Sequence, residues 1–134
     1  MSNNYQCPKR NNSINYDIHQ RIFQFIVRVL NFLNTLSFTY ANQVCKNQIT
    51  RSVTSMGAND QEADGASTSK DFLHKLTIVR KESKETLYWL KLIQSTNSFK
   101  SNLDQLIQEG NEINAIVSTI IKNSTITMRS KLKD

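Results

Sequence analysis

The chain has 134 residues, a formal net charge of +6, a hydrophobic content of 38%, three glycines and one proline. This length fits a single domain, and the scarcity of glycine and proline favours long helices because both residues interrupt them. No stretch approaches the ~20 apolar residues of a membrane-spanning helix, and the N-terminus has no signal-peptide core, so we expect a cytoplasmic protein without membrane contact. Cys7 and Cys45 are far apart in the sequence, and we expect both to be reduced.

Most of the net positive charge lies near the ends of the chain. Residues 1–14 are polar and non-periodic, and we expect a disordered leader there. Residues 125–134 form a basic tail. The bases of this tail are Arg129, Lys131 and Lys133. Between these ends the charges nearly cancel. Basic ends favour nucleic acid or an acidic membrane surface as partner, and they serve equally well as solubilising tails.

The first predicted helix runs from Tyr16 to Leu36, with Asn15 as its N-cap. Its apolar residues recur at steps of three and four, which keeps one face toward a partner because an α-helix turns once every ~3.6 residues. This core stripe consists of Ile18, Ile22, Phe25, Val29, Phe32 and Leu36. Phe23 and Leu30 widen the apolar face, which indicates a second contact surface, such as one between subunits.

The second predicted helix runs from Tyr40 to Ala63 and is polar for a bundle helix. Its core stripe consists of Cys45, Ile49, Val53 or Ser52, and Met56. Gly57 lies in the middle of this helix, where it costs ~1 kcal/mol relative to alanine. The close approach of a neighbouring helix would explain it. Residues 64–68 form the predicted loop to the next helix.

The third predicted helix has the clearest repeat; it is capped by Ser69 and ends near Gln94. Its core stripe consists of Phe72, Leu76, Val79, Ser83, Thr86, Leu90 and Ile93. The fourth predicted helix is capped by Ser101 and ends near Asn123. Its core stripe consists of Leu103, Leu106, Gly110, Ile113, Val117, Ile120 and Ser124. The four apolar stripes therefore predict an all-α four-helix bundle over residues 15–124. The short connections favour antiparallel neighbours in up-and-down order.

A set of polar residues lies in or near the predicted core. Arg51, Ser55, Asn59 and Glu62 share one face of the second helix, and Glu82 and Glu85 lie three apart on the third. Antiparallel packing would bring Arg51 or Asn59 against these carboxylates. Such a network fixes helix register if all its members are paired. A pocket for a small ligand or a phosphate is the alternative.

A row of basic residues follows the third helix on the side away from its core stripe. The row consists of Lys70, His74, Lys81, Lys84, Tyr88 and Lys91, with Arg80 at its border. Basic side chains interleaved with an aromatic one suit a phosphate backbone. An ordinary solvated face, in which Glu85 pairs with Lys81 at i,i+4, is the alternative. We expect Tyr88 and Trp89 to pack at an interface between helices or subunits.

The residue pattern argues against catalysis and against a cofactor. Di-iron bundles use two Glu-x-x-His motifs, whereas here only Asp71 and His74 have that spacing, and His19 is the only other histidine of the bundle. The serines lack a histidine and an acid at suitable positions, and no glycine-rich phosphate loop is present. We therefore expect neither an enzyme nor a metal protein.

Two segments resemble a known family. Arg51–Asn59 (RSVTSMGAN), with Glu62 and Ala63 behind it, resembles the second-helix signature of the proteins encoded in 23S ribosomal RNA intervening sequences. The strings KDFLHKL at 70–76 and KETLYWL at 84–90 resemble that family's third helix. The similarity extends over residues 16–122. It implies a left-handed antiparallel four-helix bundle, often a homopentamer, whose biochemical role is not established.

The resemblance leaves three functions open. The first is a non-enzymatic assembly protein that associates with ribosomal RNA through its outer lysines and arginines and its C-terminal tail. The second follows from a related branch, the accessory proteins of diversity-generating retroelements, which bind a reverse transcriptase and nucleic acid. That branch is strongly basic, whereas the body of this chain is nearly neutral. The third is a ligand-binding bundle that uses the cluster around Arg51 and Glu85.

Overall fold

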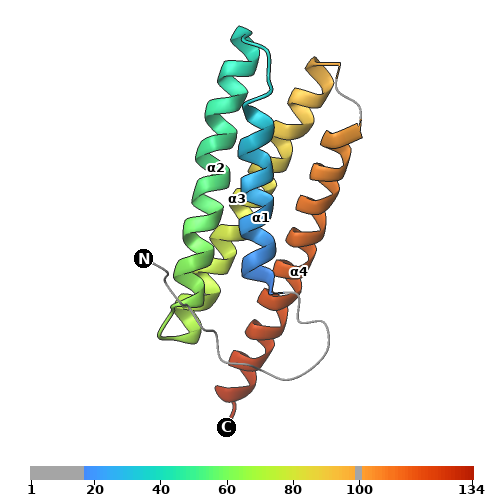
Figure 1. Ribbon diagram of the computed structural model, residues 1–134. Coiled ribbons are helices and arrows are strands. Elements are labelled where there is room, and N and C mark those ends of the chain that lie inside the picture. Colours follow the sequence, from blue (N-terminus) through green and yellow to red (C-terminus); the bar gives the residue numbers. More distant parts are fainter. Residues whose placement is uncertain (1–16, 99–100) are drawn as a thin grey trace.

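The computed structural model describes residues 17–98 and 101–134, and this part of the chain contains four α-helices and no β-strand. The helices are α1 (Ile18–Leu33), α2 (Tyr40–Asp64), α3 (Ser69–Thr96) and α4 (Ser101–Lys131). Figure 1 shows them side by side along one long axis. The prediction of an all-α protein with four helices is confirmed. The predicted leader, the cap Asn15 and Cys7 lie outside the described residues.

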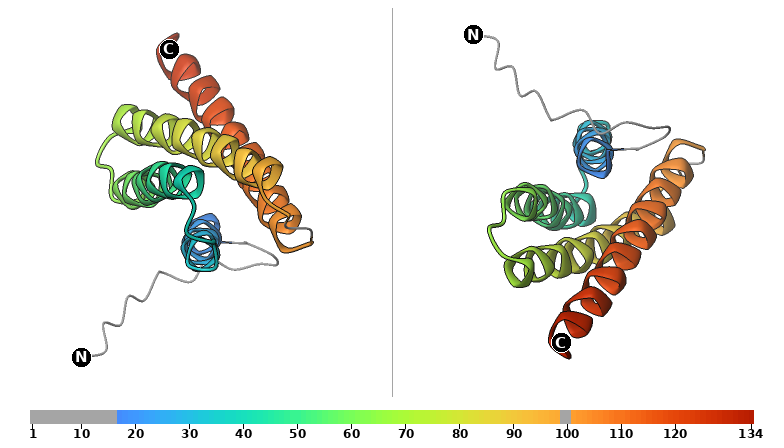
Figure 2. Two further views of the ribbon diagram at one scale, coloured as in Figure 1. Left: turned by 90° about the horizontal axis from the view of Figure 1, so that it is seen from above. Right: turned by 90° about the horizontal axis from the view of Figure 1, so that it is seen from below.

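Each helix packs against the helices before and after it in the sequence, and α1 also packs against α4. The longest seam lies between α2 and α3. At one end of this seam Asn42 pairs with Asn97, and at the other end Glu62 pairs with Lys75. Residue numbers therefore rise along α2 as they fall along α3. Figure 2 shows α1 beside α2, and the C-terminal part of α4 on the far side of α3.

Side-chain caps define where the helices begin. Asp17 caps α1 by accepting a hydrogen bond from the backbone N–H of His19, and Thr39 caps α2 by accepting one from Asn42. The cap of α3 is Thr68, not Ser69, because the hydroxyl of Thr68 accepts the backbone N–H of Asp71. The sequence prediction was therefore wrong by one residue at this cap.

Two helices end three or more residues away from the predicted position, whereas α2 and α3 end within two residues of it. Helix α1 ends at Leu33 instead of Leu36. There the backbone N–H and the hydroxyl of Thr35 both bond to the carbonyl of Phe32, which produces a turn. Helix α4 continues to Lys131 instead of ending near Asn123, so most of the predicted basic tail is helical.

Side chains near the end of α4 are compatible with its extension. The hydroxyls of Thr125 and Thr127 bond to carbonyls four residues earlier, so both polar groups have a partner within the helix. Arg129 and Lys131 lie in the last turn, where the helix dipole favours cations. The predicted Ser101 cap lies next to residues outside the described part of the chain.

The predicted core stripes are largely buried. Every predicted core position of the second helix is buried, and so are those of the third except Phe72, which is half-buried. In α4 the stripe shifts by one residue at its end, because Ile121 is buried and Ile120 only half-buried. The helical period of ~3.6 residues allows a step of either three or four after Val117, and the structure has the step of four.

Two glycines allow helices to approach closely. A Cβ on Gly57 would lie 2.7 Å from Cδ1 of Ile26, which confirms that a neighbouring helix, here α1, packs over this position. A Cβ on Gly110 would lie 2.6 Å from Cδ2 of Leu87 and 3.0 Å from Cζ of Phe25. The absence of a side chain at Gly110 therefore lets α4 pack against both α1 and α3.

Candidate functional site

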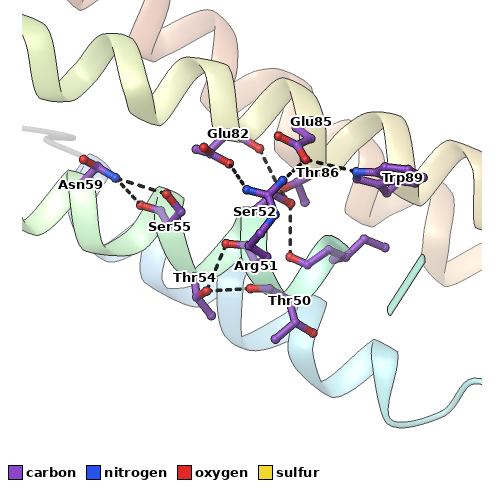
Figure 3. Close-up of polar contacts among 11 residues, drawn as sticks. Thr50, Arg51, Ser52, Thr54, Ser55, Asn59, Glu82, Glu85, Thr86 and Trp89 are labelled. Atoms are coloured by element: carbon purple, nitrogen blue, oxygen red, sulfur yellow. Dashed lines mark hydrogen bonds and ion pairs between the residues drawn. The ribbon is translucent and has the colours of Figure 1, made fainter. Parts of the chain in front are cut away.

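The predicted polar residues of α2 and α3 meet at the seam between these helices. The guanidinium of Arg51 bonds to the carboxylate of Glu85, and its Nη1 lies 3.9 Å from Oε2 of Glu82 (Figure 3). The indole Nε1 of Trp89 donates to Glu85 Oε1 at 3.4 Å. Arg51 is half-exposed, with 54% of its side-chain surface accessible, whereas Glu82 retains only 10%. Arg51 thus covers a buried carboxylate from the solvent side.

A hydroxyl pair continues this network into the core. The hydroxyls of Ser52 and Thr86 lie 2.8 Å apart across the seam, and Thr86 also donates to the carbonyl of Glu82. Both residues are fully buried. A shift of α2 along α3 by one turn would break the bond across the seam and leave each hydroxyl only with a carbonyl of its own helix. The arrangement therefore specifies the register between the two helices.

The other predicted members of the network have different partners. Asn59 donates to the carbonyl and the hydroxyl of Ser55, one turn earlier in α2 (Figure 3). Glu62 pairs with Lys75 at 2.7 Å near the end of the seam. The structure thus joins Arg51 to the two carboxylates and leaves the rest of the predicted set in local or separate contacts. The two carboxylates offset the charge of Arg51, which weakens its attraction for a phosphate.

The basic row of α3 lies on its exposed face. Lys70, Lys81, Lys84 and Lys91 are all exposed, as are His74 and Tyr88 between them. Arg80, at the border of the row, is half-buried. The alternative pairing of Glu85 with Lys81 is wrong, because Glu85 faces the seam and binds Arg51 instead. Within the described part of the chain, no salt bridge involves these four lysines.

The basic residues of the C-terminal end are also exposed. Arg129 and Lys131 lie on the last turn of α4, and Lys133 follows it. The end of α4 lies near the start of α3, since Lys131 and Ser69 line the same hollow. The predicted cations thus occupy the outer surface of α3 and the end of α4.

The residues predicted for an oligomer interface differ in exposure. Phe23 and Tyr88 are exposed, with 65% and 59% of their surface accessible, whereas Leu30 and Trp89 are half-buried. The rings of Tyr88 and Trp89 contact each other edge to face, with centroids 5.1 Å apart. Phe23 and Tyr88 are therefore available to a partner, and the other two also pack within the bundle.

A histidine cluster between α1 and α2 was not predicted. Nδ1 of His19 lies 2.9 Å from Oδ1 of Asp60, and Nε2 lies 3.2 Å from Oδ1 of Asp64. Asp60 is buried, with only 2% of its side-chain surface accessible. The hydrogen bond with Asp60 raises the pKa of His19, against the opposing effect of burial. The sequence feature that could have indicated this cluster is Asp60, an acid in line with the core stripe of α2.

A second ion-pair cluster joins α1 to α4. Nε and Nη2 of Arg21 donate to the two carboxylate oxygens of Glu109 at 2.6 and 2.9 Å, and Nη2 also contacts Glu112. This bidentate pair lowers the pKa of Glu109. Together with the His19 cluster, it attaches the shortest helix to both of its neighbours.

Within residues 17–98 and 101–134, no cluster of three or more His, Cys, Asp or Glu side chains is arranged to hold a metal ion. In that same part of the chain, none of the helices combines the length and the apolar character that crossing a membrane requires.

Comparison with known proteins identifies the family. A protein of unknown function from the S23 ribosomal protein family of Bacteroides thetaiotaomicron has a similar solved structure, with a TM-score of 0.72 and 36% sequence identity. The match covers 79% of this chain and 96% of that one. No curated protein matches the sequence. The family model described as 23S rRNA-intervening sequence protein matches residues 15–119, and the chain belongs to this family.

Proposed function

We propose that this protein is a non-enzymatic, self-assembling four-helix bundle of up-and-down antiparallel topology that binds RNA through the basic row of α3. The observation that carries the proposal is the absence of acid partners for Lys70, Lys81, Lys84 and Lys91 in the described residues. Of the three acids of α3, Glu82 and Glu85 are directed into the seam, and Asp71 is exposed next to Lys70 but forms no salt bridge with it.

The geometry of the row suits a phosphate backbone. Lys70 and Lys91 are 21 residues apart, which corresponds to ~32 Å along an α-helix. Exposed lysines along one line neutralise successive phosphates and release their counterions. Tyr88 offers an exposed ring within the row, on which an unpaired base can stack. A row that contacts phosphates without reading bases binds structured RNA with little sequence preference.

Self-assembly is supported by the apolar residues outside the core. Phe23 is the most exposed of the predicted interface residues, and Val27 is a second exposed apolar residue on the same helix. Burial of such side chains between copies removes apolar surface from water. The homopentamer follows from the family resemblance, and five copies would multiply the basic rows that one RNA molecule contacts. The retroelement relation stays a prediction from that resemblance.

The test compares charge reversals on and off the row. Lys81→Glu combined with Lys84→Glu should weaken binding of a structured RNA at least tenfold at 50 mM salt, because it replaces two attractive contacts by repulsive ones. The matched control reverses Arg28 and Lys46, which lie on other helices. If both double reversals weaken RNA binding equally, the effect reflects net charge alone, and this result would contradict a site on α3. Fluorescence anisotropy of labelled RNA measures both.

A further inference from the structure

A groove lies at the seam between α1 and α2. Its volume is about 300 Å³, and its lining is almost wholly apolar, with Phe23 and Ile26 from α1 and Ala58 from α2. Gly57 contributes to its floor because it has no side chain. Phe23 remains 65% exposed although it lines the groove. The bundle therefore leaves a concave apolar surface uncovered at this seam.

One end of the groove is acidic. Asp60 forms part of the lining, and His19 beside it also contacts Asp64. Asp17, the cap of α1, is the third carboxylate near this histidine. Three carboxylates thus surround a single imidazole, and the end of the groove has a net negative charge even when His19 is protonated. A partner that fits here combines an apolar side chain with a cation.

The end of α4 presents this combination. Ile126 is exposed, with 54% of its surface accessible. Lys122 precedes it by four residues and Arg129 follows it by three, so the three side chains share one face of the helix. Both cations are exposed, and neither forms a salt bridge within residues 17–98 and 101–134. An apolar residue between two cations complements an apolar groove with an acidic end.

The groove and the end of α4 lie apart in one molecule. In both views of Figure 2 the C-terminal end of α4 lies beyond α3, on the side opposite α1. The same part of α4 lines a hollow with Ser69 and Phe72 of α3. The groove therefore cannot receive the α4 end of its own chain.

We propose that the groove between α1 and α2 receives Ile126 from a second copy of this chain, with Arg129 of that copy against Asp64. The inference rests on the proposed self-assembly and names its contact surface. Each copy offers a groove on one side and an α4 end on the other, so the contact is heterologous. Repetition of such a contact closes a ring or extends a filament.

Charge reversal on each side of the contact tests this pairing. Asp64→Lys and Arg129→Glu should each raise the protein concentration at which the assembly dissociates at least tenfold. The matched controls are Glu62→Lys, which lies on the α3 side of α2, and Lys131→Glu, which lines the hollow beside Phe72. These controls change the charge equally and should keep the wild-type mass. The double variant Asp64→Lys with Arg129→Glu should regain most of the assembly, because it restores an opposite-charge pair.

Light scattering after gel filtration, with thermal melts to verify folding, separates the outcomes. A monomeric wild type would overturn the proposed self-assembly and with it this contact. An assembled wild type whose mass is unaffected by both reversals would overturn the contact alone. Dissociation by the single reversals without recovery in the folded double variant would also overturn the pairing. Recovery in the double variant supports it, since a general loss of stability is not repaired by a second reversal.

Discussion

Replacement of His19 by alanine should destabilise the protein by about 3 kcal/mol at pH 6. The substitution removes the hydrogen-bond partner of Asp60, whose side chain is only 2% exposed. Loss of one member of a buried ion pair costs about 3–5 kcal/mol, because the other charge stays buried and uncompensated. The lower end applies here, since 26% of the His19 side chain is accessible and solvent weakens the pair.

The effect should depend on pH in a defined direction. Asp60 raises the pKa of His19 above its ordinary value of 6.5, so the folded state holds this proton more tightly than the unfolded chain. The stabilisation by protonated His19 is therefore complete below about pH 6.5 and is lost as the pH rises through the raised pKa. One such group contributes at most about 1.4 kcal/mol per pH unit.

Urea unfolding followed by circular dichroism between pH 5.5 and 9 measures this difference. The free-energy difference between wild type and His19→Ala should shrink as the pH rises. Gln20→Ala, at an exposed position in the same turn, is the control and should leave stability nearly unchanged. The double variant His19→Ala with Asp60→Asn should recover part of the lost stability, because the buried carboxylate of residue 60 is then replaced by an uncharged amide. A difference below about 1 kcal/mol at pH 6, or one independent of pH, would refute the reasoning.

Two further substitutions test the packing of the bundle. Arg51→Ala should destabilise by about 1–3 kcal/mol because it uncovers the buried carboxylate of Glu82, and addition of Glu82→Gln should reverse part of the loss in urea unfolding. Gly110→Ala gains about 1 kcal/mol of helix propensity, but its Cβ would lie 2.6 Å from Leu87 and 3.0 Å from Phe25. Overpacking of this kind costs about 1–3 kcal/mol, so the melting temperature should fall, and a rise would show that the core has room at this position.

The periodicity of the sequence predicted most of the fold. Stripes such as Leu76, Val79, Ser83 and Leu90 are buried as their spacing required, since a helix with one apolar face must cover it. The helix ends were harder to predict. The Thr35 hydroxyl helps to end α1 early, whereas threonine hydroxyls near the end of α4 bond within the helix, so one residue type acts in opposite ways.

The polar contacts were predictable only where both partners lie on one seam. Arg51 meets Glu85 because α2 and α3 pack along most of their length. The contact of His19 with Asp60 depends on how α1 is rotated against α2. No residue spacing within either helix encodes that rotation. The sequence therefore showed an acid in the core of α2 without indicating its partner.

The salt dependence of RNA binding tests the central claim most directly. If the four lysines of the α3 row contact phosphates, the logarithm of the association constant should fall with the logarithm of salt concentration, with a slope of about −3 per engaged protomer. Reversal of Lys81 and Lys84 should reduce that slope by about two units, and the control reversal of Arg28 and Lys46 should not. Absence of binding at 50 mM salt, or a slope that both pairs change equally, would contradict RNA contact by α3.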